Sequence, residues 1–199
     1  MDQSNFITLT GCLASRPEYS HTNHGRRFFS FQLEVARLSG AIDTLPILAS
    51  EALLNTTELS DGSCLRITGQ IRSYNSRSIT GRRLIISVLA DTLELCDAPH
   101  DNEVHLSGVI CKEPTYRRTP LGREICDVML AVNRPYHRAD YLPCILWGRS
   151  AQEAAYYPIG TPLLLTGRMQ SRSYIKLLGD KAEQRTAYEI SVITAEVAE

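Results

Sequence analysis

The sequence predicts an all-β protein of two consecutive five-stranded barrels, each with one short helix between its third and fourth strands. Three observations lead to this prediction. The chain repeats itself at a spacing of 97 residues, the distance from Asn5 to Asn102. Each copy contains five apolar runs with the pattern typical of strands. Each copy also has one stretch of helix formers, and it follows the third run.

The internal repeat divides the chain into two similar halves. Identical residue types recur at this offset through the first part of each copy, and at an offset of 98 after one inserted residue. A polar stretch with a proline, D-A-P-H-D at 97–101, separates the copies. We therefore expect domains at 1–97 and 101–199. The matched pairs include Asn5 with Asn102, Gly11 with Gly108, Arg37 with Arg134, Pro46 with Pro143, Gly69 with Gly167 and Ser73 with Ser171.

The second copy is the clearer one. Its first strand, 103–111, contains Gly108, where a strongly bent strand needs a residue without a side chain. Prolines and a glycine interrupt 113–123, so this segment is expected to be a hairpin loop. Residues 149–157 are good helix formers that precede Pro158. The other strands are expected at 125–133, 141–147, 162–171 and 185–194, the last two separated by a polar loop containing Gly179.

The first copy follows the same order. Strands are expected at 5–13, 28–36, 44–49, 63–72 and 83–94, with a helical stretch at 50–59. Five strands with one helix between the third and fourth are the arrangement of the OB-fold, a Greek-key barrel that binds oligonucleotides or oligosaccharides. A β-sandwich is the structural alternative, which the helix position and strand count disfavour.

Composition restricts how such a protein could bind nucleic acid. The formal net charge is −1, so any attraction for phosphate must come from the placement of the basic residues, of which 18 of 21 are Arg. We expect a cytoplasmic protein, because the chain has neither a membrane-length apolar run nor a signal-peptide pattern at its start. Six widely spaced cysteines without a C-x-x-C pair predict free thiols. No cofactor or metal is expected; the nearest approach to a metal site is His21 with His24.

Four segments of the second copy carry a resemblance to a known family. They are N-x-V-x-L-x-G at 102–108, L-A-V-N-R at 130–134, D-Y-L-P-C-I-L-W-G-R at 140–149 and G-R-M-Q-S-R-S-Y at 167–174. In this order and spacing they resemble the bacterial single-stranded DNA-binding protein (SSB) family. The first copy keeps only the opening segment and scattered glycines, as a diverged duplicate would.

The resemblance implies a non-enzymatic protein that binds single-stranded DNA, without sequence preference, in replication, recombination or repair. By position, Tyr141, Trp147 and Tyr174 match base-stacking aromatics of the family. Stacking on a ring does not select sequence, because every base has a π-face. Strand alternation places Trp147 on the face of Tyr141, away from Cys144. The alternative is that Trp147, the only tryptophan, is a core residue.

Basic residues cluster on the predicted loops around the barrel mouth, where OB-fold proteins hold their ligands. For any single Arg a solvated surface charge is an equally good interpretation; the clustering beside aromatics favours binding. The second copy offers Arg117, Arg118, Arg123, Arg134, Arg149, Arg168, Arg172 and Lys176, and the first offers Arg72, Arg82 and Arg83 beside Tyr74.

Two departures from the family pattern shape the remaining expectations. The chain stops at T-A-E-V-A-E without the acidic tail that recruits other proteins in replicative members. In the first copy, Thr44 and Ser50 stand where the second has Tyr141 and Trp147, so we expect the second barrel to supply most of the affinity. Because single-barrel members form tetramers, the tandem chain is expected to form a homodimer with four barrels.

Three other functions compete with this prediction. A primosomal-type or scaffold protein would use its barrels mainly to bind other proteins, which the near-neutral charge supports. Single-stranded RNA is a further ligand that stacking alone does not exclude. An enzyme is disfavoured because the sequence has no G-x-S-x-G, no G-x-x-x-x-G-K and no grouped metal ligands.

Overall fold

The computed structural model describes residues 4–78, 81–178 and 181–198, and the side chains of 77–82 and 177–181 also lie outside the described part. The first copy comprises β1 (Asn5–Leu13), β2 (Glu18–Asn23), β3 (Arg26–Ala36), β4 (Ile42–Ser50), α1 (Glu51–Leu54), β5 (Cys64–Ser78) and β6 (Gly81–Leu95). The second comprises β7 (Asp101–Ile110), β8 (Thr115–Arg118), β9 (Glu124–Arg134), β10 (Arg138–Trp147), α2 (Gly148–Ala154), β11 (Pro162–Leu178) and β12 (Lys181–Val197).

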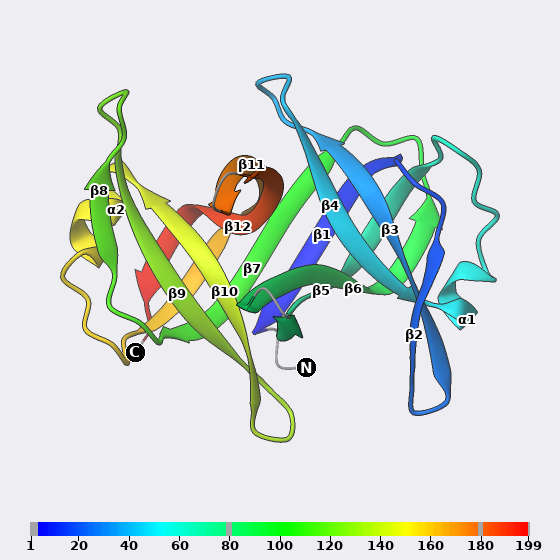
Figure 1. Ribbon diagram of the computed structural model, residues 1–199, viewed down its shortest axis with the longest axis horizontal. Helices are drawn as coiled ribbons and strands as arrows, with labels where there is room; N and C mark the ends of the chain where they lie inside the picture. Colours follow the sequence, from blue (N-terminus) through cyan, green and yellow to red (C-terminus); the bar gives the residue numbers. More distant parts are fainter. Residues whose placement is uncertain (1–3, 79–80, 179–180, 199) are drawn as a thin grey trace.

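Each copy closes into a barrel, and the two barrels lie side by side (Figure 1). In the first, antiparallel pairing of β1 with β3 and parallel pairing of β4 with β6 close the barrel. The same two pairings recur in the second, between β7 and β9 and between β10 and β12. The predicted all-β class, the two barrels and the helix between the third and fourth main strands are confirmed.

The barrels join through their first strands, which pair antiparallel in the middle of a continuous twelve-stranded sheet. Ile7 lies opposite Val104, its own equivalent in the repeat. Asn5 opposite Leu106 and Leu9 opposite Asn102 are likewise interchanged by the repeat. The junction therefore has local two-fold symmetry, as an isologous interface between two identical chains would. The segment 97–101, where we expect the domain boundary, follows the end of β6 at Leu95 and reaches Asp101, the first residue of β7.

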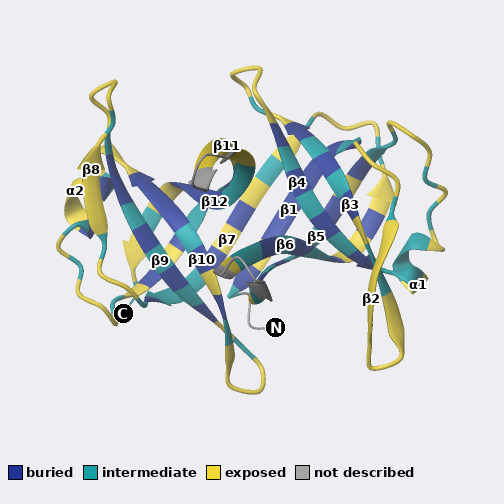
Figure 2. Cartoon of the chain, in the orientation of Figure 1, coloured by how far each residue is buried: buried dark blue, intermediate teal, exposed yellow. Residues whose placement is uncertain are grey.

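The core of each barrel follows the alternation of its strands. On β9, Cys126, Val128, Leu130 and Val132 are all buried, as the two-residue period predicts, and buried residues alternate with less buried ones along both barrels (Figure 2). Strands can curl tightly around these cores only where a glycine removes the obstructing side chain. A Cβ added to Gly108 would lie 2.6 Å from the carbonyl oxygen of Ala131, which confirms the expected requirement for glycine there.

Two strands lie where the sequence predicts none. β2 and β8 each form a hairpin with the following strand, and β8 occupies part of the segment predicted as a loop at 113–123. Every residue of both strands is exposed, so neither has the alternation of apolar side chains that marks a half-buried strand. Backbone hydrogen bonds to β3 and β9 hold them in place instead.

The helices are shorter and the last two strands of each barrel longer than predicted. α1 covers four residues of the expected 50–59, beginning after the N-cap Ser50 and ending where Asn55, Thr56 and Thr57 disfavour helix. α2 covers seven residues, and its Ala151 and Ala154 are buried against the barrel. β5, β6, β11 and β12 continue past the barrels as two-stranded arms, whose solvent-exposed parts lack an apolar period. No helix in the described ranges has the length and hydropathy to cross a membrane.

Candidate nucleic-acid interface

The two predicted aromatics of β10 are both exposed on the second barrel. Tyr141 is 44% exposed, and Trp147, the last residue of the strand, is 36% exposed. The indole Nε1 of Trp147 donates a hydrogen bond to Ser191 Oγ over 3.1 Å, which fixes the ring against β12. The interpretation of Trp147 as a core residue is therefore wrong, and a ring held in this way is preorganised for stacking.

Tyr174 lies on the β11–β12 arm and belongs to a hollow shared by both copies. The guanidinium carbon of Arg172 lies 5.9 Å from the centre of the Tyr174 ring, within cation–π range. The hollow has a volume of 430 Å³ and lies between the two arms, with Pro46 and Pro143, equivalent residues of the repeat, both in its lining. It brings Tyr174, Lys176 and Arg83 together, three predicted residues from both copies.

Four of the predicted surface arginines are paired with carboxylates, and one of them, Arg172, lies 3.6 Å from Glu189. Arg117 contacts Asp127 at 2.5 Å, Arg118 contacts Glu124 at 3.0 Å, and Arg149 contacts Glu153 at 2.8 Å. The hydrogen bond that Arg118 donates to Glu124 raises the pKa of Arg118, and the hydrogen bonds that Arg117 donates to Asp127 raise the pKa of Arg117. Such exposed pairs contribute about 0–1 kcal/mol, so phosphate could replace the carboxylate at low cost.

The other predicted basic residues of the surface stand without a carboxylate partner within the described ranges: Arg123 in the turn before β9, Arg168 on β11, Lys176 on the second arm and Arg83 on the first. Tyr74, on the first arm, is well exposed. The side chain of Arg82 lies outside the described residues.

Arg72 and Arg134 are engaged where the two barrels meet. The carboxylate of Asp140 is fully buried, and its Oδ2 lies 3.0 Å from Arg72 Nη1 and 3.3 Å from Arg134 Nε. Its Oδ1 accepts the backbone N–H of Ser73 at 2.6 Å, while Ser73 Oγ accepts the N–H of Tyr141 at 2.7 Å. We call this set the Asp140 clasp. It connects β5 of the first barrel to β9 and β10 of the second.

An equivalent set, the Asp43 clasp, connects the barrels in the opposite direction. Arg37 forms a bidentate pair with Asp43 at 2.5 and 2.7 Å, and Asp43 Oδ1 accepts the N–H of Ser171 at 2.7 Å. Ser171 Oγ in turn accepts the N–H of Thr44 at 3.1 Å. Sequence analysis missed both aspartates, although Asp43 and Asp140 lie at the same offset of 97 residues as the arginines beside them.

A group of aromatic residues on the β2–β3 hairpin was also missed. The rings of His21 and Phe28 are stacked, with centroids 5.2 Å apart and planes 11° from parallel. Tyr19 meets Phe29 edge-on at 6.0 Å, and the guanidinium of Arg27 lies within 5.5 Å of both of these rings. The sequence did contain an indication of this group, because Phe28 and Phe29 are adjacent and only one of two neighbouring residues on a strand can face the core.

The residues best placed to bind a metal are Cys12, Cys64 and His100, not His21 and His24. Cys12 Sγ lies 3.9 Å from Cys64 Sγ and 3.4 Å from His100 Nε2. However, the backbone N–H of Ala36 donates to His100 Nδ1 at 2.7 Å, so the neutral ring carries its proton on Nε2 and presents a donor to the sulfur. This geometry suits a hydrogen-bonded thiol pair better than a metal site.

None of the six cysteines is joined in a disulfide, and the expectation that they are buried free thiols rather than disulfide or zinc ligands holds for burial at only two of them. Cys126 and Cys144 are buried and the other four are half-buried. Burial raises the pKa of Cys144, and it also raises that of Cys64, which lies beside Cys12.

Comparison with known proteins shows which family the second copy resembles. Residues 101–197 match the sequence model of the single-strand binding protein family. Single-stranded DNA-binding protein B of Bacillus subtilis (strain 168) is 39% identical over 80 residues, which cover 37% of this chain and 71% of that protein. The single-stranded DNA-binding protein of Halalkalibacterium halodurans is 33% identical over 103 residues, covering 48% of this chain but only 58% of that protein.

A solved structure extends the likeness of the fold to the first copy. The wild-type single-stranded DNA binding protein from Thermus aquaticus superposes with a TM-score of 0.79 over 98% of this chain and 93% of that chain. Sequence identity over this superposition is 20%, so the comparison concerns the fold. It shows that both barrels, in their tandem order, have a counterpart in a known structure.

Proposed function

We propose that this chain, which belongs to the single-strand binding protein family, binds single-stranded DNA without sequence preference and acts in DNA replication, recombination or repair. One observation carries the proposal: Tyr141 and Trp147 expose two rings on one strand within the matched region. Each base stacked on such a ring contributes about 1–3 kcal/mol whatever its identity. The proposed role is binding, without a catalytic step.

The basic residues divide into two groups in this proposal. Arg123, Arg168, Lys176 and Arg83 contact phosphates directly, with Tyr174 stacking a base between the arms. Arg172, which lies 3.6 Å from Glu189, exchanges that partner for phosphate. Arg117, Arg118 and Arg149 exchange their carboxylate partners for phosphate. Arg72 and Arg134 face the DNA strand while remaining paired with Asp140. Their pairing with Asp140 supports a second role for both arginines in barrel assembly.

A titration with three labelled probes tests the proposal: a dT oligonucleotide, an rU oligonucleotide and a duplex of equal length, followed by anisotropy at several salt concentrations. We expect dT to bind far more tightly than duplex. The logarithm of the association constant should fall with the logarithm of salt by about 0.7 for each phosphate contact. Preference for duplex, or binding that ignores salt, would contradict the proposal, and a preference for rU would redirect it to RNA.

We further propose that the copies are domains at 1–97 and 101–199 that depend on each other for stability. The two clasps support this dependence, because each buried aspartate is bonded to a serine of the other copy. A fragment of residues 101–199 would leave Asp140 without Arg72 and Ser73. It is expected to unfold at a lower temperature than the full chain, as measured by circular dichroism.

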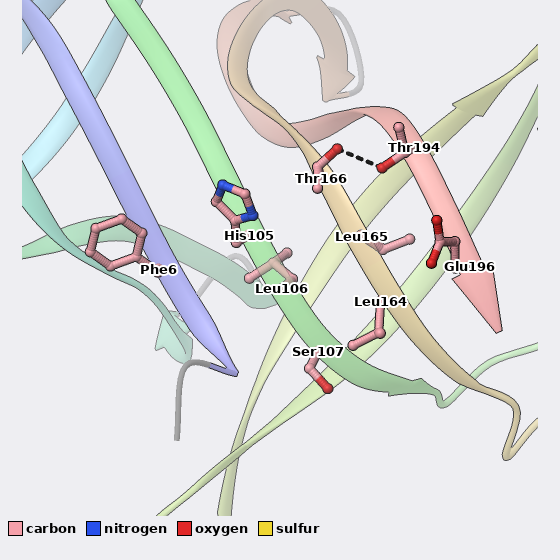
Figure 3. A pocket seen from close by; sticks show the side chains of 9 residues that line it. All are labelled: Phe6, His105, Leu106, Ser107, Leu164, Leu165, Thr166, Thr194 and Glu196. Atoms are coloured by element: carbon pink, nitrogen blue, oxygen red, sulfur yellow. Dashed lines mark hydrogen bonds between the residues drawn. The ribbon is translucent and has the colours of Figure 1, made fainter. Parts of the chain in front are cut away.

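The functional assembly that we propose is a homodimer of four barrels. An outer hollow of 480 Å³ over β1, β7, β11 and β12 supports it (Figure 3), because Phe6 and Leu164 are partly exposed there. Pairing of this face with a second copy around a two-fold axis would bury these residues.

Light scattering tests the dimer. The wild-type chain is expected to have twice the monomer mass of 22.2 kDa, and Phe6→Asp is expected to shift it toward the monomer. Tyr136→Asp, at an exposed turn residue that does not line this hollow, is the control and should leave the mass unchanged. A wild-type monomer at every concentration would overturn the proposal.

A further inference from the structure

Two cysteines that the proposed function does not use face each other across β1 and β5 of the first barrel. Cys12 and Cys64 are directly opposed in the register of these antiparallel strands, and their Sγ atoms lie 3.9 Å apart. One step further along the ladder, the N–H of Leu13 donates to the carbonyl oxygen of Ser63 over 2.9 Å. Because bonded and non-bonded pairs alternate in an antiparallel ladder, Cys12 and Cys64 form a non-hydrogen-bonded pair.

A pair of this kind can form a disulfide without movement of the strands. The Cα atoms of a non-hydrogen-bonded pair lie about 4.5 Å apart, and disulfides span Cα separations of about 4.4–6.8 Å. Rotation of the two side chains must bring the sulfur atoms from 3.9 Å to the bonded distance of about 2.05 Å. Since the Cα separation lies near the lower limit of the range, we expect the bond to be readily reduced.

Both sulfur atoms lie on the outer side of the barrel. Leu13 and Leu65, the strand neighbours of Cys12 and Cys64, are buried in the core, so alternation directs the two cysteines outward. Both cysteines are half-buried, which leaves them within reach of a solute as small as hydrogen peroxide. Phe6, which lines the proposed dimer face, lies about 20 Å from Cys12 at the other end of β1.

His100 makes the two sulfur atoms chemically unequal. Its Nδ1 accepts the backbone N–H of Ala36 at 2.7 Å, so the protonated Nε2 points to Cys12 Sγ, 3.4 Å away. A hydrogen bond donated to sulfur favours the thiolate, which is the nucleophilic form of cysteine. Cys64 Sγ has only Cys12 as a side-chain partner in the described ranges, and burial raises the pKa of its thiol. Cys12 is therefore the thiol that reacts first.

The second barrel shows that the framework does not require a thiol pair at this position. The residues equivalent to Cys12 and Cys64 are Val109 and Pro162, which are opposed in the same way on β7 and β11. The strands of the second barrel close equally well around this pair without sulfur. Barrel structure alone therefore explains neither the two thiols nor the histidine that contacts one of them.

We propose that Cys12 is a peroxide-reactive thiol and that Cys64 converts its oxidised form into a reversible disulfide. This modification site is independent of the proposed function. The Cys12 thiolate attacks one oxygen of hydrogen peroxide, so that an S–O bond forms and the O–O bond breaks. The sulfur loses two electrons to the peroxide. The leaving hydroxide takes up the proton that the Cys12 thiol gave up and departs as water.

The second step joins the two cysteines. The sulfur of Cys64 attacks the sulfur of the Cys12 sulfenic acid, an S–S bond forms and the S–O bond breaks. The hydroxide leaves as water with the proton of the Cys64 thiol. In sum, two thiols and one hydrogen peroxide give one disulfide and two molecules of water. A thiol reductant reverses the modification by exchange.

The disulfide should stabilise the first barrel. It would link residues 52 positions apart in the chain, and so enclose β2, β3, β4 and α1 in one loop. Closing a loop of this length restricts the unfolded chain far more than the folded one. We expect the thermal midpoint of the oxidised protein to lie about 5–15 °C above that of the reduced protein, as measured by circular dichroism.

Peroxide treatment of the reduced, full-length protein tests the proposal, with a chelator present to exclude metal-catalysed oxidation. We expect two of the six thiols to disappear in a colorimetric count on the denatured protein. Mass spectrometry of peptides should find Cys12 joined to Cys64, and dithiothreitol should restore both thiols. In Cys64→Ser the reaction should stop at the sulfenic acid of Cys12, which dimedone captures.

Two further variants isolate the pair and its histidine. Cys96→Ser is the matched control, because Cys96 is also half-buried and its N–H donates to the carbonyl of Cys64, and it should be oxidised as wild type is. His100→Asn keeps an acceptor for Ala36 and removes the donor to Cys12. Its oxidation at neutral pH should be at least about tenfold slower, as expected for loss of a hydrogen bond to a charged group. At alkaline pH, where an ordinary thiol ionises without help, the two rates should converge.

The outcomes decide between this site and an unreactive pair of thiols. If peroxide leaves all thiols intact, or joins cysteines other than Cys12 and Cys64, the proposal is overturned. Loss of the reaction in Cys96→Ser would also overturn it. If His100→Asn is oxidised as fast as wild type at neutral pH, the role of His100 is wrong. Thermal midpoints of the reduced variants establish that each is folded.

Discussion

The two barrels have the same framework but differ in where their aromatic rings lie. In the second, the ring beside the helix belongs to β10 as Trp147; in the first, it belongs to the neighbouring strand as Phe28. Position-by-position alignment of the copies registers Ser50 as the loss of a stacking residue. The difference teaches that a sheet face can keep a large side chain while the strand that supplies it changes, because opposed residues on adjacent strands share that face.

The clasps are where the two barrels are most alike. Each joins a buried aspartate to an arginine of its own barrel and to a serine N–H of the other. The Asp140 clasp has one additional partner, Arg72, which belongs to β5 of the first barrel. A residue predicted to bind DNA therefore also helps to join the barrels at the Asp140 clasp.

The largest expected effect compares rings with loop charges. Trp147→Ala with Tyr141→Ala removes two stacks and should weaken binding of long dT by about 2–6 kcal/mol. Arg82→Ala with Arg83→Ala should mainly reduce the salt dependence, by about 0.7 per lost phosphate contact. Anisotropy titrations at several salt concentrations measure both. If the arginine pair loses as much affinity as the aromatic pair at both low and moderate salt, the loop charges contribute as much to binding as the rings do.

The clasps should show a difference in stability. Asp140→Ala leaves two arginines without their buried carboxylate, and Asp43→Ala leaves one. Breaking a buried pair by removing one partner costs about 3–5 kcal/mol, and Asp140→Ala should be the more damaging change. Urea unfolding measures the free energies. A cost below about 1 kcal/mol for both variants would mean that the clasps do not stabilise the junction.

A smaller and equal effect is expected at the glycines that let the strands bend. A Cβ at Gly167 would lie 2.5 Å from the carbonyl oxygen of Ser191, and one at Gly69 would lie even closer to that of Leu89, so either would force the backbone to shift. Gly167→Ala and Gly69→Ala should each cost about 1–3 kcal/mol, as overpacking does. Thermal unfolding of the two variants should agree closely. A large inequality would indicate that the two barrels are unequal in framework as well as in surface.

The smallest expected effect distinguishes paired from unpaired arginines of the second barrel. Arg123→Ala should lower the salt dependence of dT binding by about 0.7, because this arginine has no carboxylate partner in the described ranges. Arg117→Ala should lower it less, since Asp127 already neutralises that charge. The slopes come from the same titrations. If Arg117→Ala has the larger effect, pairing with Asp127 does not reduce the contribution of Arg117 to phosphate binding.

Much of the framework could be predicted because it depends on local pattern. The alternation at Cys126, Val128, Leu130 and Val132 identified the buried face of β9, and Gly108 identified a bend. The exposed strands β2 and β8 could not be found in this way, because no apolar period marks a strand without a buried face. The sequence also did not predict the arms that extend beyond the barrels, because their exposed parts have no apolar period.

By itself the sequence determined that this protein has two copies of one barrel, where their cores lie, and that Tyr141 and Trp147 belong to one strand face. Only the tertiary structure decided that Phe28 lies opposite Ser50, that Asp43 and Asp140 bind serines of the opposite copy, and that Arg72 of the first barrel shares Asp140 with Arg134. The physical reason is that strand register and the docking of the barrels are non-local. They follow from which strands pair and how their faces meet, and no period within a single strand encodes that choice.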